Sequence, residues 1–106
     1  MEELTVYWTS FAEDKLNNIF EYYVVKASVR IAKKLVLGII ERTINLDKNP
    51  YMGQKEELLA DRPQGFRYLV YKNYKIVYWI NTGKSRIEIV NVFDCRQNPE
   101  KMNDMI

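Results

Sequence analysis

The chain has 106 residues, of which 47% are hydrophobic and 28% are charged, and its formal net charge is +2. This is the composition of a globular domain, no apolar run reaches the roughly 18 residues that cross a bilayer, and the first residues lack the order of a signal peptide. The chain holds no histidine and one cysteine, Cys95, which excludes an internal disulfide, a Cys/His zinc site and nucleophiles that depend on histidine. We therefore expect one domain over residues 1–106, in the cytoplasm, without metal or cofactor.

A strand followed by a helix is predicted at the start of the chain. Residues 3–9 alternate apolar with other side chains, as a half-buried strand does. Ser10 stands three residues before Glu13, the spacing of a capping box, so a helix is predicted to begin near Phe11 and to end near residue 26. Its apolar stripe has spacings of three and four and comprises Ala12, Leu16, Ile19, Phe20 and Tyr23.

A second amphipathic helix is predicted over residues 28–47, where Asn49-Pro50 stops it. Because the link between the two helices is short, they are predicted to form an antiparallel hairpin. Residues 49–64 carry prolines, a glycine and several charges, so they are predicted to be a loop with one short turn near Leu58 and Leu59.

Three strands are predicted next, over residues 65–71, 74–81 and 85–93, because these segments are rich in β-branched and aromatic residues and are separated by short turns. Residues 98–106 are polar and are predicted to form a short terminal helix or a mobile tail. The predicted fold class is α+β, with an N-terminal strand, a helical hairpin and a three-stranded antiparallel meander. One mostly antiparallel sheet would pack one face against the hairpin.

The small net charge hides an uneven distribution. Residues 1–61 carry a charge of −2, residues 62–96 carry +5 and the remaining residues carry −1, and seven aromatic residues fall within 62–96. Such a segment suits a surface for phosphates and unstacked bases, but a one-sided antiparallel sheet with a solvated basic face has the same pattern. With a two-residue turn at residues 72–73, Lys75 shares a face with Tyr68, and Arg67 shares the other face with Tyr78.

These elements, in this order, resemble the RelE/ParE toxins of bacterial type II toxin–antitoxin systems, and the resemblance covers most of the chain. It implies the fold of those toxins and a complex in which an antitoxin wraps its C-terminal segment over the helices and the sheet. The segments that carry the resemblance are 6–12, Asn49-Pro50 with Gly53, 67–69 leading into 74–78, and 87–93 followed by Asp94-Cys95-Arg96.

The resemblance implies two alternative activities. RelE-like members are ribosome-dependent endoribonucleases that cut messenger RNA, and their basic catalytic positions fall on Lys75, Arg96 and Arg67. ParE-like members act on DNA gyrase without known cleavage. The stretch after Arg96 lacks the tyrosine or histidine that nuclease members often carry there, and guanidinium groups do not act as bases. The sequence therefore favours a ParE-like toxin that acts by binding, with a nuclease or a degenerate toxin that only helps repress its own operon as alternatives.

Each basic candidate also has a purely structural interpretation. Arg67 would pair with Asp61 or Glu88, Lys75 would be a solvated strand residue, and Arg96 would pair with Asp94 at the strand end. An antitoxin helix or strand is expected to add to the sheet edge or to the helical hairpin.

Overall fold

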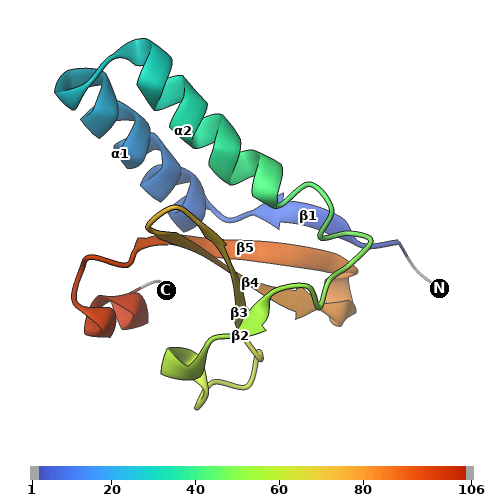
Figure 1. Cartoon of the computed structure of the whole chain (residues 1–106). Coiled ribbons are helices and arrows are strands. Elements are labelled where there is room, and N and C mark those ends of the chain that lie inside the picture. Colours follow the sequence, from blue (N-terminus) through green and yellow to red (C-terminus); the bar gives the residue numbers. More distant parts are fainter. Residues whose placement is uncertain (1–2, 105–106) are drawn as a thin grey trace.

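The computed structural model describes residues 3–104, in which a helical hairpin covers one face of a five-stranded sheet (Figure 1). The predicted order of a strand, two helices and a meander is confirmed, and residues 105–106 of the predicted tail lie outside the described residues. The elements are β1 Thr5–Trp8, α1 Ser10–Lys26, α2 Val29–Arg42, β2 Gln54–Lys55, η1 Glu57–Leu59, β3 Arg67–Tyr71, β4 Tyr74–Asn81, η2 Thr82–Lys84, β5 Arg86–Asp94 and η3 Pro99–Asp104, where η denotes a 3₁₀ helix.

The strands lie in the order β1-β5-β4-β3-β2, with β1 parallel to β5 and the other neighbours antiparallel. Tyr71 lies opposite Tyr74, so the two-residue turn is confirmed, and Lys72 within it has a φ of 53°. The predicted faces follow from this register, since Arg67 pairs with Tyr78. No helix in the described part of the chain is long and apolar enough to span a membrane.

The predicted cap of α1 is wrong. The N-cap is Thr9, whose hydroxyl accepts a hydrogen bond from the Ala12 amide at 3.2 Å and donates one to the Ile89 carbonyl at 3.1 Å. Ser10 is already helical. Thr9 takes this role because it is the residue at which the chain leaves β1 beside β5, so one hydroxyl fixes both the helix start and the strand end.

Two further boundaries differ from the prediction. Helix α2 ends at Arg42 rather than near residue 47, because the Thr43 hydroxyl donates to the Ile40 carbonyl at 2.7 Å and the chain continues in turns. The side chain of Arg42 also reaches the edge of β3 and donates to the Val70 carbonyl at 3.0 Å. Strand β2 lies within the predicted loop and is too short to show a period in the sequence.

Both faces of the sheet bury side chains. The hairpin face carries the predicted core, with the buried residues Ala12, Leu35, Ile39, Leu46, Leu69, Tyr74, Ile76, Tyr78, Ile87, Ile89 and Val92. A second cluster, which the sequence did not predict, lies on the opposite face, where η1 and η3 contact each other. Its buried members are Leu59, Phe66, Val77, Phe93 and Met102.

Candidate functional site

Lys75 lies on β4, on the sheet face opposite the hairpin, and is held within the protein. Its Nζ is 2.9 Å from Oε2 of Glu56 and 4.3 Å from the centroid of the Tyr68 ring. The Glu56 side chain is only 2% exposed, and its Oε1 accepts a hydrogen bond from the Leu58 amide. Lys75 therefore neutralises a buried carboxylate and ties η1 to the sheet, so the prediction of a solvated strand residue is wrong.

Arg67 lies at the start of β3, and its side chain binds the loop that precedes β2. Its Nε donates to the Gly53 carbonyl at 3.0 Å, and its guanidinium lies 5.2 Å from the centroid of the Tyr51 ring. Tyr78 holds the same loop, because its hydroxyl accepts from the Gly53 amide and donates to the Pro50 carbonyl. Burial raises the pKa of Tyr78, although the bond with Gly53 and the nearby Arg67 charge oppose this.

The ion pairs predicted for Arg67 are wrong. In the described part of the chain, Glu88 pairs instead with Arg86, whose Nε lies 3.1 Å from Oε2, and it accepts a second hydrogen bond from Asn81 at 2.7 Å. Burial opposes ionisation of Glu88, but these two hydrogen bonds outweigh it and lower the pKa of the carboxyl. Arg86 also stacks on Tyr7, with 4.0 Å between the guanidinium carbon and the ring centroid.

Arg96 follows β5 and pairs with Asp94, as predicted. Its Nη2 is 2.8 Å from Oδ2 of Asp94 and its Nε is 3.0 Å from Oδ1, while the arginine side chain stays 63% exposed. Asp94 also accepts hydrogen bonds from the Arg96 amide and from the Asn73 side chain. The hydrogen bonds from Arg96 dominate and lower the pKa of Asp94 to about 2, and in return the pKa of Arg96 lies above its ordinary value.

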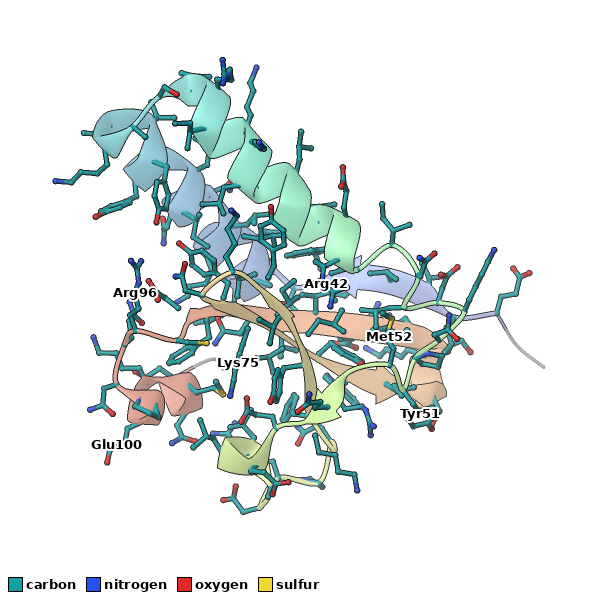
Figure 2. The ribbon with its side chains drawn as sticks, viewed as in Figure 1. Arg42, Tyr51, Met52, Lys75, Arg96 and Glu100 are labelled. Carbon is teal, nitrogen blue, oxygen red and sulfur yellow. The ribbon has the colours of Figure 1, made fainter. Side chains whose placement is uncertain are left out.

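The fold distributes these three basic residues over different surfaces. Lys75 lies on the face opposite the hairpin, whereas Arg67 is opposite Tyr78, toward the far end of β4. Arg96 lies past the end of β5, and Figure 2 shows it beyond that strand while Lys75 lies beneath the sheet. Each of the three is already bonded to protein atoms, and the structure does not bring them together around one point.

A cavity of about 360 Å³, which was not predicted from the sequence, lies between α1 and the end of β5. Of the three basic candidates, only Arg96 lines it. The signal in the sequence was the second stripe of α1, because Lys15, Asn18 and Tyr22 follow one another at helical spacing. The lining residues are Lys15, Asn18, Ile19, Tyr22, Tyr23, Tyr74, Val92, Asp94, Arg96 and Gln97.

The rings of two tyrosines that line this cavity lie close to each other. The centroids of Tyr22 and Tyr23 are 5.1 Å apart, in an edge-to-face arrangement. Burial raises the pKa of Tyr74, and the neighbouring hydroxyl of Tyr23 and the charge of Asp94 raise it further. The Tyr74 hydroxyl is thus buried and interacts with Tyr23 inside the protein.

Comparisons with known proteins agree with the architecture. Residues 6–99 match the family described as the ParE toxin of type II toxin-antitoxin system, parDE. A solved structure described as the chromosomal ParDE TA system from P. aeruginosa contains a chain with a TM-score of 0.72 and 21% identity, covering 87% of this chain and 96% of that chain. No curated protein matches the chain significantly. Because the family match spans nearly the whole sequence, the chain belongs to the ParE toxin family of type II toxin–antitoxin systems.

Proposed function

We propose that this protein is the toxin of a type II toxin–antitoxin pair and inhibits growth by binding its target, which in the ParE-like branch is DNA gyrase. Membership of the ParE toxin family supports the toxin role. The similar chain from P. aeruginosa belongs to a ParDE toxin–antitoxin system, which supports a cognate antitoxin as the partner. Residues 1–106 would act as one domain, in the cytoplasm and within a toxin–antitoxin hetero-oligomer.

Binding is favoured over RNA cleavage because each of the three basic residues is already bonded to other atoms of the protein. Attack by a ribose 2′-hydroxyl needs a base, an acid and a cation around one phosphate. Lys75 is paired with Glu56, Arg67 is bonded to the Gly53 carbonyl and Arg96 is paired with Asp94. Three cations that are separated and already bonded support a toxin that holds its target rather than one that moves protons at a phosphate.

The proposal is tested with purified protein, gyrase and relaxed plasmid. Supercoiling should fall as the protein is titrated in, and addition of the product of the adjacent antitoxin gene should restore it. Relaxation by a type I topoisomerase serves as the control and should be unchanged. Normal supercoiling in the presence of excess protein would overturn the gyrase proposal.

A parallel assay on translating ribosomes separates the alternatives. Under the proposal the messenger RNA stays intact at protein excess. Cuts at the A-site codon that disappear with Arg96→Ala would establish the endoribonuclease instead. If both assays are silent and expression without the antitoxin is harmless, the protein is a degenerate toxin that acts only through its antitoxin.

A further inference from the structure

Helix α1 carries opposite charges on its two exposed sides. Lys15, Tyr22 and Lys26 follow one stripe of the helix, which borders the cavity between α1 and the end of β5. The Lys26 ammonium lies 6.0 Å from the Tyr22 ring centroid. Glu13 and Asp14 point elsewhere, since they line a separate depression on another side of the helix. The side of α1 that lines the cavity is therefore the cationic and aromatic one.

The opposite wall of the cavity presents a second cation in a fixed position. The guanidinium of Arg96 is held by both oxygens of Asp94. Asp94 is the one acidic residue among the lining side chains, and its oxygens already bond Arg96 and the Asn73 amide. The pair of Arg96 and Asp94 is neutral overall, so Lys15 supplies the net positive charge of the lining, and the guanidinium of Arg96, whose side chain is 63% exposed, adds hydrogen-bond donors.

The interior of the cavity has a mixed apolar and hydroxyl character. Ile19 and Val92 line it together with the rings of Tyr22 and Tyr23, and Tyr22 remains 54% exposed. The cavity has a volume of about 360 Å³, which suits one or two side chains.

We propose that this cavity, the α1–β5 pocket, binds a carboxylate side chain of a protein segment, together with a neighbouring apolar side chain. Lys15 and Arg96 approach the carboxylate from the two walls, while the apolar neighbour packs on Ile19 and Tyr22. The occupant is an acidic segment of a partner protein that carries an apolar residue beside the carboxylate, and the inference does not depend on gyrase being the target.

A protein segment fits the pocket better than a nucleic acid. A phosphate backbone is held by a track of several cations, whereas Lys15 and Arg96 are the only basic residues that line this pocket within residues 3–104. One carboxylate beside an apolar group matches both the charge and the size.

The test is an NMR titration of the ¹⁵N-labelled protein with the acetylated, amidated peptide Glu-Leu-Glu-Leu-Glu. We expect saturable shifts at the backbone amides of residues 15–23 and 92–97. The same peptide with glutamine in place of glutamate is the ligand control and should bind about fivefold more weakly or less. Equal binding of the two peptides, or shifts concentrated elsewhere, would overturn the proposal.

The variant that tests the pocket is Lys15→Gln, because this change leaves the pair between Arg96 and Asp94 intact. This substitution should weaken the binding of the glutamate peptide about fivefold. Lys33→Gln, on α2 and away from the pocket, is the matched control and should leave binding unchanged, while the spectra report whether each variant is folded. Unchanged affinity in Lys15→Gln, or tighter binding at the same amides by a ten-nucleotide single-stranded DNA, would contradict a carboxylate site.

Discussion

At Gly38, helix α2 packs directly against the side chain of Tyr71 on β3. A Cβ atom added at this position would overlap the phenol ring of Tyr71 on β3. The helix can lie directly on that ring because Gly38 has no side chain, and the buried Ile39 beside it belongs to the hairpin-face core. The glycine is thus a packing requirement in the middle of a helix, where the backbone itself would prefer alanine.

Gly38→Ala should lower the free energy of unfolding by about 1–3 kcal/mol, because the overlap with Tyr71 outweighs the better helix propensity of alanine. Urea unfolding followed by circular dichroism measures the change. Gly83→Ala is the matched control, since the nearest atom to an added Cβ there is Oδ1 of Asn81 at 3.5 Å, and it should stay within about 0.5 kcal/mol of the wild type. A more stable Gly38→Ala variant would contradict this packing.

The pair of Asp94 and Arg96 makes stability depend on pH in the acid range. The pKa of Asp94 falls from 3.8 to about 2 on folding, so the contribution of its carboxylate is present above pH 3.8 and is lost as the pH falls toward 2. Asp94→Asn should therefore flatten the fall in melting temperature between about pH 4 and pH 2. Arg96→Gln, which removes the donor, should flatten it too, and equal slopes in all three proteins would show that the pair contributes nothing.

Among the elements, α1 depends on the side chain of Thr9. Thr9→Ala should cost about 1–2 kcal/mol, because it removes the cap on the Ala12 amide and the bond to the Ile89 carbonyl. Ser10→Ala, one residue further on, should change stability by less than about 0.5 kcal/mol. Thermal unfolding of the two variants decides between the caps, and the reverse ranking would restore the capping box predicted from the sequence.

The segment that joins β2 to η1 depends on Lys75. Lys75→Met should destabilise the protein by roughly 3 kcal/mol, because it leaves the buried Glu56 carboxylate without its partner. The double variant Lys75→Met with Glu56→Leu should recover most of this loss, as measured by urea unfolding. The double variant is then the proper reagent for the ribosome assay, since it removes the lysine while keeping the fold. A double variant as unstable as the single one would contradict this role.

Elements with a clear period or clear turns were predictable from the sequence, whereas those made by long-range contacts were not. Strand β4 was predicted at its observed bounds, because turn residues flank an alternating apolar run. Strand β2 was missed because its position depends on Arg67 and Tyr78 holding the loop at Gly53. Tertiary bonds of this kind leave no local pattern.

The same limit applies to the candidate site. Arg96 was identified from its place after the last strand, and its pairing with Asp94 followed from their spacing. Lys15 and Tyr22 could not be identified as site residues from the sequence. The apolar stripe of α1 predicts only which side of the helix is buried. Only the packing of α1 against β5 brings these two residues to the same cavity as Arg96.

At the scale of the whole molecule, the two faces of the sheet are covered by different elements. The hairpin face carries the main core and the α1–β5 pocket, while the opposite face is closed by η1 and η3. Met102 of η3 is fully buried there against the second cluster, and Arg62 lies 3.4 Å from the side-chain oxygen of Asn103. The η3 segment thus supports the fold from the side that the hairpin does not cover.

Met102→Ala tests whether the second cluster stabilises the whole protein. It should lower the free energy of unfolding by about 2–4 kcal/mol, because a fully buried side chain leaves a cavity beneath η3. Met52→Ala, at a side chain that is 44% exposed, is the control and should cost less than about 1 kcal/mol. Because the α1–β5 pocket lies on the other face, Met102→Ala should still bind the glutamate peptide at the wild-type affinity while folded. A loss of peptide binding in the folded variant would show that the two faces are coupled through the sheet.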